Sequence, residues 1–192
     1  MTTPIILEDK RVRLEPLTME NAPALTGVAS QPGLVAYSPS DIESPEALMR
    51  YVGKALELQR KKSCIPFLVY DKNSRTAAGS TRYMNIDWHN KVVEIGSTWI
   101  GREFQGTGLN THMKYQMLRH AFEEMGFEKV EFRIDERNQR SRMAVEKLGA
   151  TLEGILRKNV YLLDGYKRNT CCYGILLEEW PNLKQTLKLR LR

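Results

Sequence analysis

The chain has 192 residues, of which 42% are hydrophobic and 27% charged, and its formal net charge is +6. These proportions are typical of a globular protein with a sizeable core, and no apolar run approaches the roughly 20 residues that cross a bilayer. The 3 cysteines form neither a disulfide framework nor a zinc-ligand spacing. We therefore expect one cytoplasmic domain over residues 1–192, without a metal or a membrane partner. The positive charge suits an acidic ligand such as a phosphorylated cofactor.

The first half of the chain predicts helices on either side of a loop, followed by an antiparallel meander. The expected elements are a strand over residues 11–16, a short helix over 18–28, a loop over 30–44, a helix over 44–61, and strands over 65–70, 76–85 and 91–100. Thr18 is the predicted N-cap of the short helix. Ser44, Pro45 and Glu46 give the second helix an N-cap, a first-turn proline and an acidic residue at its positive end.

The second half predicts a helical crossover and a long hairpin. The expected elements are a helix over residues 109–125, a strand over 129–134, a helix over 138–148, strands over 151–162 and 166–177, and a basic segment from 178. Gly126 and Gly149 end the two helices, and Asp164-Gly165 is a strong hairpin signal. Because a helix separates the strands over 91–100 and 129–134, we expect them to be parallel neighbours joined by a right-handed crossover.

A glycine-rich segment joins the strand that ends near Ile100 to the helix that begins near Leu109. A helix N-terminus leaves backbone N–H groups without partners, and glycines let the backbone approach an anion closely. The segment therefore predicts an anion-binding turn. A P-loop is unlike it, because Thr107 and Gly108 stand where Lys and Ser/Thr should follow, and Thr111 replaces the third glycine of a dinucleotide fingerprint. A tight turn without a ligand stays open at this point.

Four segments share their order and spacing with one family. They are Glu-Ile-Gly-Ser-Thr-Trp at 94–99, Gln-Gly-Thr-Gly-Leu-Asn at 105–110, Asn138 with Ser141 and Glu-Lys-Leu-Gly at 146–149, and Glu-Gly-x-x-Arg at 153–157. Together they resemble the Gcn5-related N-acetyltransferases, and within them the RimJ/RimL-like group of ribosomal-protein N-terminal acetyltransferases. The loop of this family is Gln/Arg-x-x-Gly-x-Gly/Ala, and the chain departs from it at Asn110.

The resemblance implies an α/β (α+β) fold with one mixed, mostly antiparallel sheet of about seven strands, flanked by helices and splayed between its two central parallel strands. It also implies acetyl-CoA as co-substrate, with the diphosphate on the loop and the pantetheine arm beside the strand before it. The implied cofactor-binding residues are Thr98, Trp99, Ile100, Gln105, Gly106, Thr107, Gly108, Leu109, Asn110, Asn138 and Ser141. Asn138 is equally an ordinary helix N-cap, and one residue can do both.

Acetyl transfer to an amine needs a base for the amine and a proton for the departing thiolate. Glu94 is the first candidate for the base, since the sheet cleft would raise the pKa of a carboxylate there. A surface carboxylate, or an ion pair with an arginine such as Arg82, is the alternative, and His89 is a second candidate base. Many relatives carry a tyrosine acid where this chain has Val145. Ser141 is therefore the candidate that hydrogen-bonds the sulfur or passes it a proton from water.

The predicted activity is direct transfer of acetyl to a primary amine, of a protein N-terminus or a small molecule, in a ternary complex. No cysteine stands where a nucleophile is expected, which disfavours a covalent intermediate. The acceptor pocket is expected between the 30–44 loop, the 87–90 loop and the C-terminal hairpin. Its candidate lining residues, which do not identify an acceptor, are Arg82, Tyr83, Asp87 and Trp99.

Two other functions stay open. The absent tyrosine would suit a catalytically idle acyl-CoA-binding module that senses its ligand. The basic tail would suit a nucleic-acid or ribosome-binding protein through Lys184, Lys188, Arg190 and Arg192. A solvated helix face explains those charges better, so we expect no specific nucleic-acid partner. Homodimers are common in the family, but the sequence indicates no interface.

Overall fold

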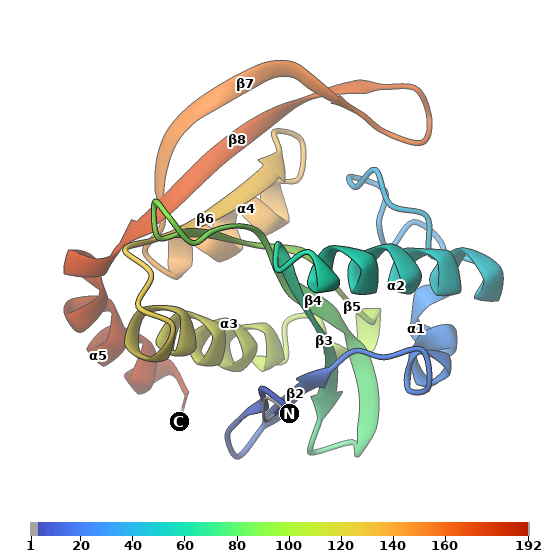
Figure 1. Cartoon of the computed structure of the whole chain (residues 1–192), viewed down its shortest axis with the longest axis horizontal. Coiled ribbons are helices and arrows are strands. Elements are labelled where there is room, and N and C mark those ends of the chain that lie inside the picture. Colours follow the sequence, from blue (N-terminus) through green and yellow to red (C-terminus); the bar gives the residue numbers. More distant parts are fainter. Residues whose placement is uncertain (1–3, 192) are drawn as a thin grey trace.

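Eight strands form one mixed sheet in the computed structural model, which describes residues 4–191 (Figure 1). They are β1 (Leu7–Glu8), β2 (Val12–Pro16), β3 (Cys64–Asp71), β4 (Thr76–Asp87), β5 (Val92–Ile100), β6 (Lys129–Asp135), β7 (Thr151–Tyr161) and β8 (Lys167–Leu176). Their order across the sheet is β1-β2-β3-β4-β5-β6-β8-β7. The predicted fold class is confirmed. The strand beyond the expected seven is β1, whose two residues are too few to show an alternating pattern.

Helices pack on both faces of this sheet. They are α1 (Thr26–Ala29), α2 (Pro45–Arg60), α3 (Leu109–Arg119), α4 (Gln139–Lys147) and α5 (Trp180–Arg190). Arg82 of β4 lies over the Tyr51 ring of α2, whereas its neighbour Tyr83 donates a hydrogen bond to the Met117 carbonyl of α3. Successive strand residues point to opposite faces. We call these the α2 face and the α3 face, and α4 covers the α3 face next to α3, because its Arg142 donates to the Tyr173 hydroxyl of β8.

Two predicted helices differ from those observed. The helix expected from Thr18 begins as a 3-10 turn at Ala22 and continues as α1, because Thr18 and Asn21 bond to each other's backbone N–H in a turn before it. The helix expected over 109–125 is α-helical only to Arg119 and then widens to a π-helix over His120–Glu124. Gly126 follows with φ +71°, as expected of a glycine that ends a helix.

The predicted parallel pair and its splay are both present. Val92, Val93 and Glu94 of β5 pair in parallel with Lys129, Val130 and Glu131 of β6. Beyond Glu94 the two strands no longer pair, although β5 continues to Ile100 and β6 to Asp135. Among residues 4–191, no strand pairs with the edge of β5 that faces β6 over residues 95–100.

The β7–β8 hairpin is long and arches over β6 and α4 toward the loop before α2 (Figure 1). Its Arg168 donates a 2.9 Å hydrogen bond to the Tyr37 carbonyl in that loop. The predicted turn at Asp164-Gly165 is confirmed, with Gly165 at φ +81°. The hairpin therefore contacts the 30–44 loop.

Candidate active site

The splay between β5 and β6 lies next to a bulge in β5. Ser80 of β4 pairs with Trp99 and Arg82 with Gly96, so one β4 residue faces two β5 residues, Ser97 and Thr98. Ser97 takes a positive φ of +46°. A bulge bends a strand and redirects its side chains. Here it sends Trp99 to the α2 face, where its indole N–H donates to the Tyr51 hydroxyl at 3.2 Å, and Thr98 to the α3 face, where it contacts Thr81 at 2.7 Å.

The glycine-rich loop follows directly from this unpaired strand edge. Gly106 and Gly108 have φ of +78° and +89°, which non-glycine residues rarely adopt, and a Cβ at either position would meet open space. In the described part of the chain, no protein acceptor is found for the backbone N–H groups of Gly106, Thr107, Gly108 and Asn110. Their N–H groups lie at the N-terminus of α3, where the helix dipole favours an anion. The loop therefore fits the diphosphate of a nucleotide-bearing cofactor.

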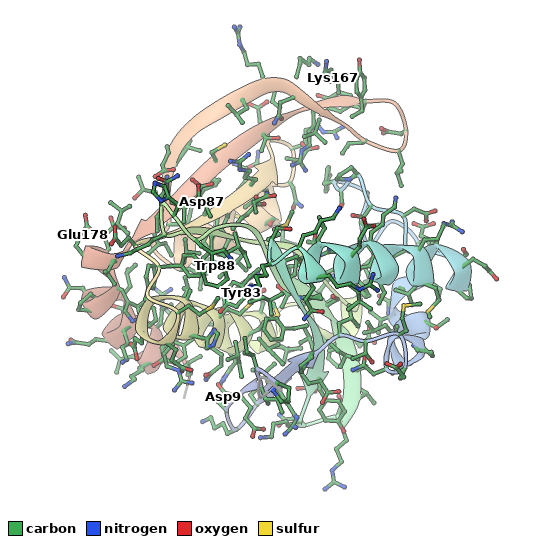
Figure 2. All side chains as sticks on the ribbon, in the orientation of Figure 1. Asp9, Tyr83, Asp87, Trp88, Lys167 and Glu178 are labelled. Carbon is green, nitrogen blue, oxygen red and sulfur yellow. The ribbon has the colours of Figure 1, made fainter. Side chains whose placement is uncertain are left out.

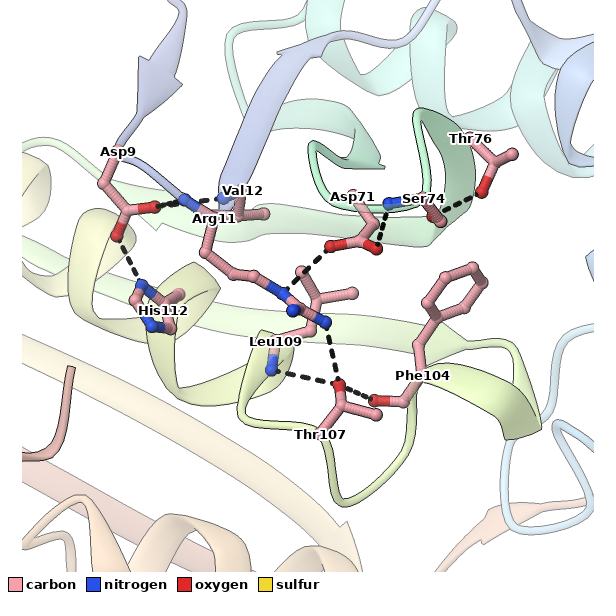
Figure 3. Close-up of polar contacts among 10 residues, drawn as sticks. All are labelled: Asp9, Arg11, Val12, Asp71, Ser74, Thr76, Phe104, Thr107, Leu109 and His112. Carbon is pink, nitrogen blue, oxygen red and sulfur yellow. Dashed lines mark hydrogen bonds and ion pairs between the residues drawn. The ribbon is translucent and has the colours of Figure 1, made fainter. Parts of the chain in front are cut away.

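Arg11, which immediately precedes β2, contacts this loop (Figure 3). Its guanidinium forms a 3.0 Å ion pair with buried Asp71 and reaches the Thr107 hydroxyl at 3.4 Å. Thr107 in turn donates to the Phe104 carbonyl at 2.7 Å. The contact fixes the loop and adds a positive charge beside it. Sequence reasoning missed Arg11, because only the β2–β3 pairing and the fold of the loop bring it there.

The N-terminus of α4 approaches the other side of the loop. Asn138 caps this helix, as predicted, by accepting the Ser141 N–H at 3.1 Å. Arg140 donates a hydrogen bond to the Gln105 side chain, whose own amide donates to the Ile100 carbonyl at 2.9 Å. The structure thus brings together the loop, the end of β5 and the first turn of α4. Arg140 is a second cation that the sequence did not indicate.

Glu94 lies on the α2 face at the last paired position before the splay. It is 6% exposed, and burial raises the pKa of its carboxyl group, against a 2.7 Å hydrogen bond from Asn85 and the charge of Arg133, which lower it. The arginine nearest to Glu94 is Arg133 of β6, at 3.7 Å, and not Arg82 as the sequence suggested. Arg82 is instead held at the Tyr51 ring, 4.4 Å from its centroid.

The residues proposed to line the acceptor pocket occupy three different places. Arg82 and Trp99 lie together on the α2 face, both in contact with Tyr51. Tyr83 is fully buried between the sheet and α3, in the middle of the molecule (Figure 2). Asp87 is the last residue of β4 and accepts the Asn90 N–H at 2.8 Å, and His89 in the turn that follows is exposed.

Lys114 is a site residue that sequence reasoning missed. It lies on α3, is 5% exposed, and donates a 2.7 Å hydrogen bond to the Thr98 hydroxyl of β5. Burial alone lowers the pKa of Lys114 to about 7. A signal was available: Met117, Leu118 and Ala121 follow it at helical spacing, so this lysine stands within the apolar stripe of its helix.

Two cavities lie outside the splay. A cavity of about 250 Å³ opens between the 30–44 loop and the hairpin turn, with Val35, Ser38 and Asp164 in its wall. A cavity of about 490 Å³ lies between α3 and α5, where His112 and Asp9 are 2.7 Å apart (Figure 3). Residues 4–191 contain no cluster of His, Cys, Asp and Glu arranged to hold a metal ion. Across the same residues, every helix is too short or too polar to span a bilayer.

Comparisons with known proteins identify the family of the chain. The family model of the acetyltransferase (GNAT) domain matches residues 11–151. A Bacillus subtilis (strain 168) protein named "Putative ribosomal N-acetyltransferase YdaF" is 32% identical over 117 residues, which cover 61% of this chain and 61% of that protein. The matched region thus spans less than two thirds of the curated relative.

Solved structures match over the full length of the chain. A protein of T. thermophilus is 33% identical with a TM-score of 0.89, and the match covers 100% of both chains. A GCN5-related N-acetyltransferase from Brucella melitensis is 28% identical with a TM-score of 0.90, covering 100% of this chain and 87% of that one. The splayed sheet and its flanking helices therefore belong to a known architecture.

Proposed function

The chain belongs to the GNAT acetyltransferase family, and on that premise we propose that it passes acetyl from acetyl-CoA directly to a primary amine. The family resemblance found in the sequence is confirmed, and enzymes of this family are acetyl-CoA-dependent N-acetyltransferases. The Bacillus subtilis relative supports the group of ribosomal-protein acetyltransferases within it. We also propose that residues 1–192 form one domain, because β2 near the start and β8 near the end belong to the same sheet.

The observation that carries the proposal is the unpaired edge of β5 running straight into the glycine loop. Backbone groups in a sheet interior need partners, and the amides of a pantetheine arm can pair with those of Thr98, Trp99 and Ile100. The N–H groups of Gln105 to Asn110 would hold the diphosphate, with the charges of Arg11 and Arg140 beside it. When bound, acetyl-CoA supplies an activated acetyl group as a thioester.

The far side of the arm would meet the first turn of α4. Asn138 and Ser141 are both half-buried there, and the Ser141 hydroxyl has no hydrogen-bond partner among the described residues. A free hydroxyl can donate to a neighbouring sulfur or orient a water. We assign Ser141 this contact with the sulfur, since Val145 replaces the tyrosine expected one helix turn further on.

Glu94 would take the proton of the incoming amine, directly or through a water. It lies on the α2 face, which it shares with Arg82 and Trp99 of the proposed acceptor pocket. The base and the acceptor would therefore approach the splay from one face. Direct transfer is preferred to a covalent intermediate, because burial raises the thiol pKa of Cys64, Cys171 and Cys172 and so disfavours a thiolate nucleophile.

A thiol-release assay tests this proposal. Wild-type protein is mixed with acetyl-CoA and a panel of amines: peptides with the N-termini of ribosomal proteins, polyamines, aminoglycosides and amino-acid derivatives. We expect amine-dependent release of CoA with at least one class, and mass spectrometry identifies the acetylated nitrogen. Tight acetyl-CoA binding without release across the whole panel would instead favour an idle acyl-CoA-binding module.

A further inference from the structure

The amino group of Lys114 lies on the α3 face of the sheet, beside the separated ends of β5 and β6. It is 2.7 Å from the Thr98 hydroxyl of β5 and 5.9 Å from the centre of the Phe132 ring of β6. Both residues come after the paired stretch, which ends at Glu94 and Glu131. The lysine therefore borders the α3 side of the place where β5 and β6 part.

The surroundings of this amino group offer it no counter-charge. In the described part of the chain, no ion pair involves Lys114, and burial is the single cause of the shift in its pKa. The other titratable groups on this face include Tyr83 of β4, Arg119 of α3, His120 and Glu124 of the π-helix that follows it, Arg142 and Glu146 of α4, and Cys171 and Tyr173 of β8. The tyrosines and the α4 pair bond to partners other than Lys114. A buried, unpaired lysine is costly for the fold, so a role in chemistry is the better account of it.

Lys114 and Glu94 flank the splay from opposite faces of the sheet. Arg133 of β6 is the partner of Glu94, whereas its neighbour Phe132 is the residue that contacts Lys114. Adjacent strand residues point to opposite sides. A thioester held in the splay would thus have a carboxylate on its α2 face and an amino group on its α3 face.

We propose that Lys114 is the general acid of the reaction, and that its ammonium group gives a proton to the sulfur of CoA as the thioester is broken. This inference rests on the proposed acetyltransferase function. The amine nitrogen forms the new C–N bond with its electron pair, and the C–S bond breaks with its pair moving to sulfur. Sulfur takes a proton from Lys114, and the amine nitrogen gives one to Glu94 or to water. Lys114 is left neutral and regains a proton from solvent.

The titration of Lys114 suits this role. With its pKa near 7, the ammonium is a stronger acid than a thiol of pKa about 8.5, so proton transfer to a departing thiolate is downhill. The group also regains its proton readily near neutral pH. A lysine at its ordinary pKa of about 10.4 would hold the proton too tightly. Lys114 thereby supplies the acid that the tyrosine replaced by Val145 does not.

The test compares Lys114→Met, Lys114→Arg and the surface control Lys54→Met, which changes an exposed lysine of α2. General acid catalysis contributes about 100- to 10,000-fold, so we expect kcat with acetyl-CoA to fall at least 100-fold in both Lys114 variants. Lys54→Met should match the wild type. Calorimetry should give dissociation constants for acetyl-CoA that agree within about threefold among the wild type and the three variants. With 4-nitrophenyl thioacetate, whose leaving thiol is acidic, Lys114→Met should retain most of the wild-type rate.

A measurement on the unliganded protein stands beside the kinetics. NMR of the lysine side chains should show one group, absent from Lys114→Met, with a titration midpoint near 7. A midpoint above 10 in the wild-type protein overturns the proposal, and this measurement does not depend on whether the Lys114 variants fold. So does a kcat within threefold of the wild type, or a loss confined to acetyl-CoA affinity, which would make Lys114 a binding residue. Wild-type protein that releases no CoA with any amine would overturn the proposed function itself.

Discussion

In the proposed mechanism, two buried ionisable residues, Glu94 and Lys114, make the proton transfers at the splay. Burial raises the pKa of the Glu94 carboxyl, and Asn85 and Arg133 limit that rise. A base in this position has a higher proton affinity than a surface glutamate. Its chemistry depends on the strand pairing that sets Arg133 beside it.

Replacing Glu94 with Gln should remove the base while keeping the hydrogen bond from Asn85. We expect kcat/KM to fall by about 100-fold or more, since general base catalysis contributes 100- to 10,000-fold. In the wild type, kcat/KM should decline as pH falls through the raised pKa of Glu94, and that step should be absent from the variant. The measurement is a pH–rate profile. Glu131→Gln, on the same face of the neighbouring strand, is the control; an equal loss there would point to a general effect of charge on this face.

Lys114 is expected to lower the stability of the fold although it supports activity. Its pKa is about 7 in the fold and about 10.4 unfolded, so between these values the unfolded chain binds more protons. The free energy of unfolding should therefore rise as pH increases from 7 to 10.4, and the destabilisation is complete below 7. By linkage the whole effect is on the order of a few kcal/mol.

Lys114→Met should consequently be more stable than the wild type at pH 7, and its advantage should shrink as pH rises toward 10. Urea unfolding of both proteins at several pH values measures this difference, in which all other titrations cancel. A variant less stable than the wild type across the range would show that the Lys114–Thr98 hydrogen bond stabilises the fold more than burial of the amine opposes it.

At the scale of elements, the glycine loop and its flanking strand act as one unit. The bulge at Ser97 frees the end of β5, and the loop continues that end into α3 with unpartnered N–H groups. Gly106 and Gly108 are needed for their positive φ, since neither is crowded. The backbone conformation of Gly106 and Gly108 thus sets the direction of the unpartnered N–H groups of the loop.

Gly108→Ala tests the loop, with Gly126→Ala as its matched control. Both glycines have a positive φ, +89° and +71°, and a Cβ at either would meet nothing within 4 Å. Each substitution should therefore cost a similar strain of about 1–2 kcal/mol. Calorimetry should show acetyl-CoA binding weakened about tenfold or more in Gly108→Ala alone, because only there does relief of strain move the anion-binding N–H groups. Equal affinities in the two variants would contradict this account of the loop.

The sequence predicted the elements with strong local signals and missed those that depend on distant partners. Alternation, caps and turn glycines gave seven strands, the parallel crossover and the hairpin at Asp164-Gly165. The two-residue β1 and the π-helix after Arg119 carry no such pattern. Arg82 was one example of an arginine that could pair with Glu94, whereas the register with β6 places Arg133 there. Arg11 reaches the loop from the turn before β2, almost a hundred positions earlier in the chain.

At the scale of the whole molecule, the candidate site lies where the pairing between two central strands of the sheet ends. The crossover through α3 makes β5 and β6 parallel neighbours, their divergence opens the splay, and α3 and α4 line one side of it. The β7–β8 hairpin and the 30–44 loop meet through Arg168 and Tyr37 (Figure 1). In the proposed function, the loops would thus determine which acceptor binds, and the edge of the sheet would bind the cofactor.

The central claim is that acetyl-CoA lies along the unpaired edge of β5 with its diphosphate on the glycine loop. Titration of the ¹⁵N-labelled protein with CoA, followed by amide NMR, tests it most directly. We predict the largest shifts at Thr98, Trp99, Ile100, Gly106 and Gly108, with the cavity between α3 and α5 unaffected. Shifts that gather instead at Asp9 and His112, or that leave the loop unchanged, would contradict it.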